Sequence, residues 1–198
     1  MSELFLSRTL CPSDYTALEN ELPHTLGFVT VDDPPHRHWE YALALHSIGR
    51  WLDAGHHLHG STCDISIEPR LWTEELPITR LAISADADLA GLPLKDVITS
   101  FTTVTQVEDL ERYCYHLSCL LAPGGLLILT MEYWDRCGED RAVGARTRRR
   151  IFCPKTYAQL RTALTPLHLT TFGGVDPAYH GRQVHDYTLA SLVLEKRR

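Results

Sequence analysis

The sequence lacks several features that would assign a protein to a class at once. No apolar run approaches the roughly 18 residues of a transmembrane helix, and a net charge of −6 disfavours general binding to nucleic acid or to a membrane surface. The chain also contains no G-x-S-x-G, no P-loop, no C-x-x-C pair and no H-E-x-x-H. These absences predict a protein without a transmembrane helix and exclude the enzyme classes that these motifs mark.

Cysteine is present but does not form a recognisable framework. The six cysteines have no metal-binding or redox spacing, and most of them lie inside apolar patterns. We therefore expect them to be reduced and the protein to be cytoplasmic. The first 15 residues lack the basic and apolar regions of a secretory signal, in agreement with that expectation.

The composition that remains is that of an ordinary globular protein. Of the 198 residues, 44% are hydrophobic and 22% are charged, and this length suits one main domain. Residues 1–38 are irregular and end near a Pro-Pro pair, which blocks a helix. We expect them to form an N-terminal extension packed on a core made by residues 39–198.

The clearest pattern lies between residues 96 and 134, where it predicts a strand, a helix and a second strand. Residues 97–103 are rich in β-branched side chains, and residues 108–121 repeat apolar side chains at helical spacing. A Pro-Gly-Gly turn at residues 123–125 separates this helix from a continuous apolar run at residues 126–131. The run is typical of a strand covered on both faces, so the unit is a parallel, right-handed crossover.

The flanking segments extend this crossover into a larger sheet. The further elements that the patterns predict are helices at residues 39–52 and 155–164 and strands at residues 61–67, 78–84, 167–172 and 183–195. The last strand is apolar on both faces, so it belongs inside the sheet, antiparallel to the strand before it. The predicted fold is a three-layer α/β sandwich whose sheet is mostly parallel.

In this order of elements the sequence resembles the class I S-adenosylmethionine-dependent methyltransferases. Residues 96–100, with the sequence DVITS, are similar to the fourth strand of that family. The L-x-P-G-G-x-L block at residues 121–127 is similar to the turn and fifth strand that come next in the family. The acidic loop that begins at Asp86 is similar to the loop that holds the adenine ring. The resemblance spans roughly residues 39–196 and implies a Rossmann-like sandwich, abridged in its cofactor-binding half.

Two alignments place the cofactor, S-adenosylmethionine, on this chain. In the first, residues 51–55 are the first strand and its loop, so Asp53 and Gly55 lie beside the cofactor and Asp64 ends the second strand. Only residues 56–60 then remain to connect two parallel strands, although such a crossover normally needs at least about 10–12 residues.

In the second alignment, residues 39–52 are all helix and residues 61–67 are the first strand, and a later strand–helix unit is missing. The helical periodicity of residues 39–52 supports it. In either alignment the usual Gly-x-Gly is replaced, by His56-His57 in the first and by Ser66-Ile67-Glu68 in the second. Glycines at this place let the backbone approach the amino-acid part of the cofactor.

The resemblance implies methyl transfer to a small-molecule or glycan-like acceptor. Asp64 and Asp86 would anchor the ribose or the adenine, Gly55 would allow backbone approach, and residues 100–106, beginning with Ser100, would face the donor methyl. Many small-molecule members carry an acidic residue and a histidine after the fourth strand, where this chain has Thr105-Gln106. Neither of these is a general base near neutral pH, so no catalytic residue is assigned.

A second function stays open beside the first. The chain could be a methyltransferase-like protein that has lost the cofactor and serves as a binding or structural subunit of a larger assembly, for example a phage particle. Its partners are accordingly a small molecule or other proteins, with no nucleic acid and no membrane, and its oligomeric state is open.

Three further clusters of polar side chains have a functional and a plain structural interpretation. The histidines of residues 56–59 with Cys63 could bind zinc, but their spacing is loose and no second ligand pair is evident, so no metal is predicted. His185-Asp186 resembles a base with its partner, although such a pair is more often structural. The arginine-rich residues 146–150 form a solvated basic edge or, alternatively, a lid or an anion contact.

Overall fold

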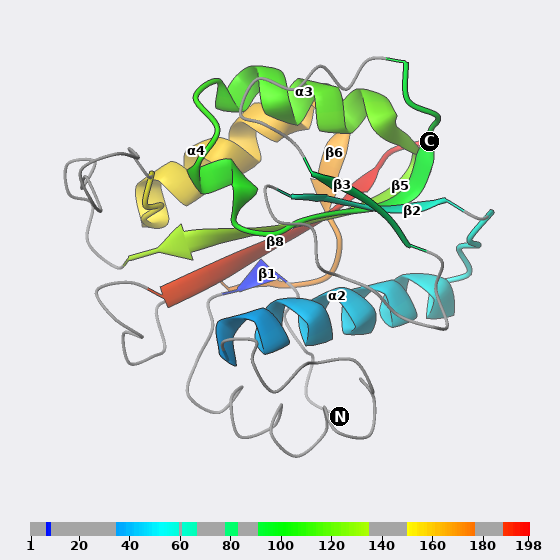
Figure 1. Cartoon of the computed structure of the whole chain (residues 1–198), viewed down its shortest axis with the longest axis horizontal. Helices are drawn as coiled ribbons and strands as arrows, with labels where there is room; N and C mark the ends of the chain where they lie inside the picture. Colours follow the sequence, from blue (N-terminus) through cyan, green and yellow to red (C-terminus); the bar gives the residue numbers. More distant parts are fainter. Residues whose placement is uncertain are drawn as a thin grey trace.

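The core of the molecule is a six-stranded sheet between two layers of helix (Figure 1). The computed structural model describes residues 7–8, 35–59, 61–66, 78–82, 91–134, 150–176 and 188–198.

The sheet has the strand order β3-β2-β4-β5-β8-β6. Its strands are β2 (Thr62–Ser66), β3 (Ile78–Ala82), β4 (Lys95–Ser100), β5 (Leu121–Tyr133), β6 (Leu169–Thr171) and β8 (Thr188–Lys196). The first four in spatial order are parallel, whereas β8 is antiparallel to both β5 and β6. The prediction of a mostly parallel sheet with an internal, antiparallel last strand is therefore confirmed. Two short strands, β1 (Ser7–Arg8) and β7 (Val175–Asp176), pair with each other in a separate parallel sheet.

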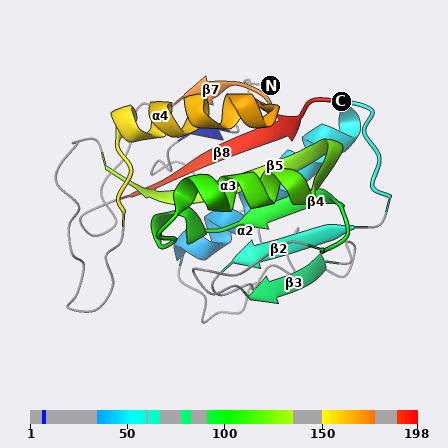
Figure 2. The same cartoon turned by 90° about the horizontal axis from the view of Figure 1, so that it is seen from above.

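The helices cover the sheet from both sides. α3 (Leu110–Leu120) and α4 (Pro154–Leu164) lie on one face, and α2 (Pro35–Asp53) lies on the other (Figures 1 and 2). Two 3-10 turns, η1 (Thr103–Thr105) and η2 (Thr165–Leu167), come after β4 and α4. α3 begins two residues later than predicted because Asp109 is its N-cap, with a carboxylate oxygen that accepts a hydrogen bond from the Arg112 amide at 2.9 Å.

Alternation along the strands divides the buried side chains into two cores. Leu127 and Leu129 belong to the core under α3 and α4, whereas Leu126 and Ile128 belong to the core under α2. All four side chains are fully buried. This explains why the sequence shows an unbroken apolar run here, because the strand is covered on both faces.

The predicted Pro-Gly-Gly turn lies at the start of β5 and allows close approach of the backbone. Gly124 has a positive φ of 78°, and a Cβ at Gly125 would lie 2.8 Å from the Ala122 carbonyl oxygen and 2.9 Å from that of Asp96. Both positions therefore require glycine. The Trp51 indole N–H donates to the Gly124 carbonyl at 3.1 Å, which ties the end of α2 to this turn.

The sheet topology decides between the two alignments. Residues 51–53 are the last residues of α2, so the first alignment, which made residues 51–55 a strand and its loop, is wrong. β2 lies between β3 and β4 and is the first strand of the parallel sheet, as the second alignment requires. Residues 54–61 connect a helix to a strand rather than two parallel strands, and a short link is sufficient for that.

The expectation of reduced cysteines is only partly met. Cys63, Cys114 and Cys119 are free, but Cys153 is disulfide-bonded, so the prediction is wrong for that residue. Free buried cysteines behave as small apolar side chains, in agreement with their place inside apolar patterns of the sequence. Cytoplasmic location and the boundary at residue 38 stay predictions.

Two further observations bear on membrane and metal binding. None of the helices in the described parts of the chain has the length and apolar character needed to cross a membrane.

His56 stacks on Trp51 with ring centroids 4.8 Å apart and lies 3.7 Å from the Glu195 carboxylate, so its ring is engaged in packing. In the described residues no three potential ligands come together as a metal site, and His185-Asp186 lies outside these residues.

Candidate functional site

The described sheet has a topological switch point between β2 and β4. The strand that follows β2 in the chain, β3, lies on one side of this point, and the strand that follows β4, β5, lies on the other side. Ligands of open α/β sheets bind outside the carboxyl ends of the strands at such a point. In this chain these ends are Ser66 of β2 and Ser100 of β4.

On the α2 face, a buried carboxylate joins the two strand ends. Asp64 is fully buried, and its Oδ1 accepts hydrogen bonds from the Ser66 hydroxyl at 2.7 Å and the Thr99 hydroxyl at 3.1 Å. Asp64 and Thr99 are direct neighbours across the parallel pair. The Ser66 oxygen in turn accepts from the Phe101 amide at 3.1 Å. Ser66 thus fills the space between the two strand ends and satisfies a backbone donor that the strand pairing leaves open.

On the opposite face, a tyrosine from α3 joins the same strands. The Tyr113 hydroxyl lies 2.7 Å from the Ser100 hydroxyl and donates to the Ile65 carbonyl at 3.3 Å. Burial raises the pKa of Tyr113 well above its ordinary value, because the ring lies where a phenolate would be poorly solvated. The hydroxyl therefore stays protonated and acts as a hydrogen-bond donor across the neutral pH range.

The turn after β4 is held in a strained conformation. Thr102 has φ 50° and ψ 3°, in the left-handed region that a β-branched residue rarely adopts. Its amide donates to both the carbonyl and the hydroxyl oxygen of Thr130, at 3.1 and 2.9 Å. The Thr130 hydroxyl donates to the carboxylate of Glu40, which is fully buried on α2. A chain of hydrogen bonds from α2 through β5 thus holds the turn in place, as strained residues at functional sites require.

The residues at the position of the family's acidic–His pair contain no general base. The Thr105 hydroxyl donates to the Thr102 carbonyl at 2.5 Å. The Thr105 carbonyl accepts a hydrogen bond from the Arg150 amide at 2.7 Å. Thr105 is buried and Gln106 is half-buried. This surface can donate hydrogen bonds and can position a ligand, but it cannot remove a proton near neutral pH.

The structure brings together only some of the residues that the sequence indicated. Asp64 and Ser100 lie near the carboxyl ends of the neighbouring strands β2 and β4, with their side chains on opposite faces of the sheet. Asp53 is the last residue of α2 and Gly55 lies just after it in a turn with φ 89°, so both are exposed and precede the amino end of β2. Asp86 lies outside the described residues. The structure places Asp64 in the first strand of the parallel sheet, and its role in holding the ribose or the adenine stays a prediction.

The described residues agree only in part with a site for S-adenosylmethionine. The hydroxyl-rich turn of residues 102–106 stands where the donor methyl would face, and its backbone strain marks it as a constrained surface. The glycine turn is not supplied, because Ser66 occupies its first position and is almost fully buried by its own contacts.

Solved structures with the same arrangement of strands and helices identify the fold. A 1,6-didemethyltoxoflavin-N1-methyltransferase from Burkholderia thailandensis, with 1,6-didemethyltoxoflavin and S-adenosylhomocysteine bound, has a TM-score of 0.53 and 16% sequence identity, over 96% of this chain and 92% of that chain. An S-adenosylmethionine-dependent methyltransferase from Clostridium acetobutylicum has a TM-score of 0.50 and 10% identity, over 91% and 99% of the two chains. The chain has the class I methyltransferase fold.

The likeness of this methyltransferase-like chain to other proteins rests on structure. No protein-family model and no curated protein sequence matches it. The cyclase SpnF has 17% identity and a TM-score of 0.44, over 61% of this chain, and the chain spans only 57% of SpnF.

The sequence did not indicate two members of the site, Tyr113 and Glu40. Tyr113 appears in the sequence only as part of an apolar helix face, although a buried tyrosine hydroxyl needs a partner and thus signals a polar contact. Glu40 interrupts the apolar face of its helix in the same way. Thr102 lies within residues 100–106, which the sequence did indicate, but nothing in a run of threonines predicts its left-handed backbone.

Proposed function

We propose that this chain binds S-adenosylmethionine at the carboxyl ends of β2 and β4 and transfers its methyl group to a small-molecule or glycan-like acceptor. The strained turn at Thr102 carries this proposal. A left-handed threonine costs about 1–2 kcal/mol, and here a fully buried Glu40 and Thr130 are committed to holding it. Such strain is concentrated at functional sites, and this one lies at the switch point where the fold binds ligands.

The chemistry of the turn sets the class of acceptor. With Thr105 and Gln106 at the position of the acidic–His pair, the site has hydrogen-bonding groups but no base. Transfer to an acceptor that is already nucleophilic, such as an amine or a thiolate, does not need one. The Burkholderia enzyme, which is named as an N1-methyltransferase of a small molecule, supports an acceptor of this kind.

A calorimetric titration with S-adenosylmethionine and S-adenosylhomocysteine tests the proposal. We expect saturable binding of one ligand per chain in the micromolar range, which corresponds to about −8 kcal/mol. The Gln106→Ala variant should bind more weakly, and Asp53→Asn, at the other end of β2, should bind like the unmodified chain. No heat at millimolar ligand would overturn the proposal, and a loss confined to Asp53→Asn would mean that the site lies at the end of α2.

A specific observation also favours the second function, a binding or structural subunit that does not use the cofactor. The described strand ends are closed by the chain's own groups, with Ser66 between Asp64 and Phe101 on one face and Tyr113 against Ser100 on the other. A ligand that approached the backbone here would have to displace these contacts.

The Ser66→Gly variant separates the two functions. If Ser66 blocks an otherwise competent site, the glycine should confer measurable cofactor binding on a chain that had none. If the site is already competent, the variant should bind no better than the unmodified chain, because Ser66 was not the obstacle. Ser118→Gly, at a serine on α3 away from the strand ends, controls for the general effect of a new glycine.

A further inference from the structure

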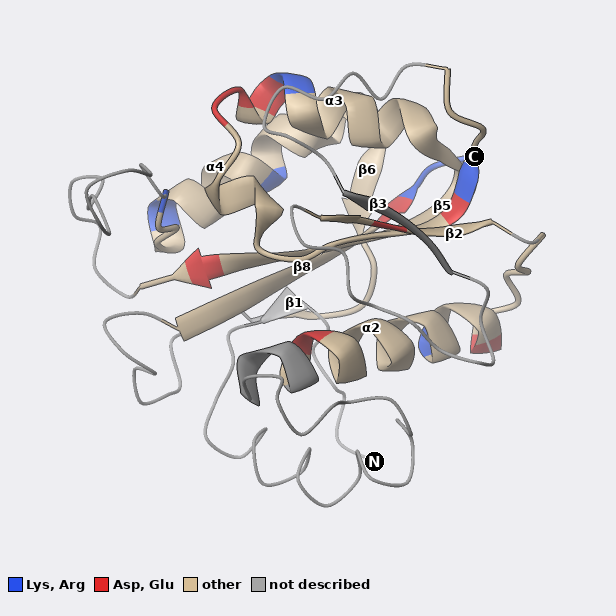
Figure 3. Ribbon diagram, in the orientation of Figure 1, with Lys and Arg blue, Asp and Glu red and all other residues tan. Residues whose placement is uncertain are grey.

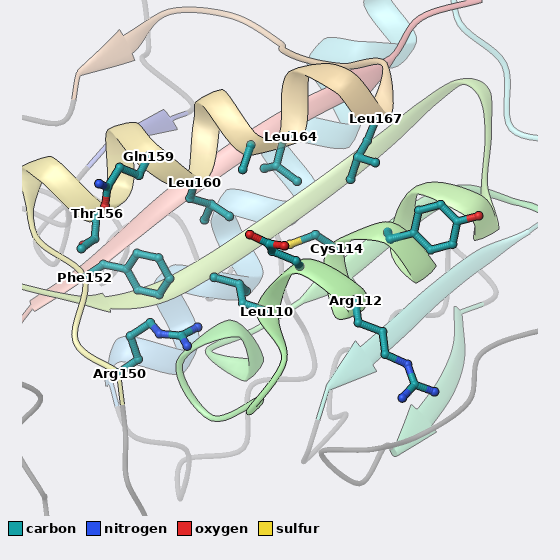
Figure 4. Close-up of a pocket in the computed structure, with 13 residues that line it drawn as sticks. Leu110, Arg112, Cys114, Arg150, Phe152, Thr156, Gln159, Leu160, Leu164 and Leu167 are labelled. Atoms are coloured by element: carbon teal, nitrogen blue, oxygen red, sulfur yellow. The ribbon is translucent and has the colours of Figure 1, made fainter.

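A groove between α3 and α4 is a feature of the described structure that the proposed function does not use. It has a volume of about 810 Å³ and lies on the helical side of the sheet (Figure 4). Pockets for small molecules have volumes of roughly 300–1,000 Å³. Its walls are mostly apolar, with Leu110 from α3, Leu160 and Leu164 from α4, and Phe152 at the base.

One end of this groove carries Arg150, a half-buried arginine. The Nη1 atom of Arg150 is fully buried and has no hydrogen-bond partner among the residues that the structure describes. Figure 4 shows the Arg150 side chain beside Phe152 and Leu110, with its guanidinium directed toward the groove wall. A buried guanidinium N–H without an acceptor is costly, and carboxylates and phosphates are the acceptors whose geometry a guanidinium matches.

The backbone fixes this cation in place. The Arg150 amide donates to the Thr105 carbonyl at 2.7 Å, and the Phe152 amide donates to the Glu132 carbonyl at 2.9 Å. The Trp134 amide donates back to the Phe152 carbonyl at 2.8 Å, which continues the pairing beside β5. The backbone at this end of the groove is thus ordered before a ligand binds.

The other charges around the groove favour a single negative charge on the ligand. Glu111 and Arg112 are the charged residues of α3, and both lie near its start (Figure 3). Glu111 is exposed and lines the groove, and Figure 4 shows the Arg112 side chain turned away from it. Burial raises the pKa of the Cys114 thiol to about 12 despite the nearby Arg150. The Cys114 thiol is therefore uncharged near neutral pH and adds no charge to the groove.

We propose that the groove between α3 and α4 binds an apolar molecule that ends in a carboxylate, with Arg150 as the partner of that carboxylate. The apolar part lies along the leucines of α3 and α4, where it is removed from water. A phosphate monoester, which carries a second negative charge, is the poorer ligand because the groove offers the single cation of Arg150 and is also lined by Glu111. The inference stands whether or not the chain transfers methyl groups, because the groove and the strand ends share no side chain.

The test is calorimetric titration of the full chain with decanoate, with 1-decanol and decyl phosphate as comparisons. We expect saturable 1:1 binding of decanoate below millimolar concentration. Binding of 1-decanol should be at least about tenfold weaker, because the hydrogen bond between charged groups is lost. Binding of decyl phosphate should also be at least about tenfold weaker, because a second charge is buried. Arg150→Gln should weaken decanoate binding at least about tenfold. Arg112→Gln, at an exposed arginine that points away from the groove, is the matched control and should leave the affinity within about twofold.

A second variant keeps the test independent of Arg150. Ala163→Phe fills the groove from an exposed position on α4, so it should prevent decanoate binding without loss of the fold. Both groove variants, Arg150→Gln and Ala163→Phe, should have the same thermal unfolding midpoint as the unmodified chain, which confirms that the variants fold. The proposal is overturned if decanoate shows no saturable binding at millimolar concentration, or if 1-decanol binds as tightly as decanoate. It is also overturned if decyl phosphate binds more tightly than decanoate, or if Arg112→Gln weakens decanoate binding as much as Arg150→Gln does.

Discussion

The two halves of the sheet differ in how firmly they are built. In the C-terminal half, β5 and β8 pair from Leu126 opposite Glu195 to Tyr133 opposite Thr188. In the other half, β2 pairs with β4 only from Thr62 to Asp64, and β3 forms the edge of the sheet.

A lysine further secures the C-terminal half. The Lys196 ammonium donates to the carbonyl oxygens of Ser118 and Leu121 at 2.7 and 2.8 Å, and these belong to the end of α3 and the start of β5. A cation there also opposes the negative end of the helix dipole. In the described residues, the C-terminal half is therefore held by longer strand pairings than the half that would hold the cofactor. Evidence for the fold is thus not evidence for the activity.

The largest effect expected is a difference between two matched core substitutions. Ile128 of β5 and Ile65 of β2 are both fully buried. Ile128→Ala should lower the free energy of unfolding by about 2–5 kcal/mol and reduce amide exchange protection throughout β5 and β8. Ile65→Ala should reduce protection mainly in β2, since that half can open by itself. Equal losses in β8 for the two variants would show that the halves unfold as one unit.

The next effect is a loss of stability at alkaline pH. Burial raises the pKa of Tyr113, and it raises the pKa of Cys63 to about 11. Each group is an acid whose pKa is higher in the folded state, so its contribution is complete below the unfolded pKa and is lost as pH rises through the folded value. Urea unfolding between about pH 8 and pH 11 should show falling stability, at up to about 1.4 kcal/mol per pH unit for each group.

The Tyr113→Phe variant isolates the contribution of Tyr113 to the loss of stability at alkaline pH. It should be less stable at neutral pH by about 1–2 kcal/mol, because Ser100 and Ile65 lose a hydrogen-bond partner. Its alkaline slope should be smaller, because a phenylalanine does not titrate. An unchanged slope would place the origin of the alkaline effect elsewhere.

A smaller effect tests the strain at the switch point. Thr102 and His168 are the two non-glycine residues with positive φ in the described parts of the chain. Thr102→Gly and the control His168→Gly should each raise stability by up to about 1 kcal/mol, since the relief of strain is offset by the freedom that glycine adds to the unfolded chain. Only Thr102→Gly should weaken binding of S-adenosylmethionine. Equal affinity in the two variants would dissociate the strain from function.

The smallest effect concerns the groove, which lies on the C-terminal half. Arg150→Met should leave thermal stability unchanged or raise it by up to about 1 kcal/mol, because it removes a buried donor for which the described residues offer no acceptor. Arg112→Met, at an exposed residue, should have no measurable effect. A marked loss of stability in Arg150→Met would mean that the guanidinium is satisfied within the folded chain.

The contrast between the halves also explains what the sequence could predict. The helix at residues 39–52 and the apolar run at residues 126–131 were predictable because periodicity reports burial directly. The pairing of β2 with both β3 and β4 was not, since two alignments satisfied the same local patterns and only the topology separated them. The hydrogen bond from Tyr113 to Ile65 joins residues distant in sequence, so no local pattern reports it.

The most direct test of the proposed site is nuclear magnetic resonance of the amide groups during titration with S-adenosylhomocysteine. We expect chemical-shift changes at residues 64–66 and 99–106, where the carboxyl ends of β2 and β4 meet. Residues 53–55 should not respond. Changes confined to residues 53–55, or none anywhere at millimolar ligand, would contradict a cofactor site at the switch point.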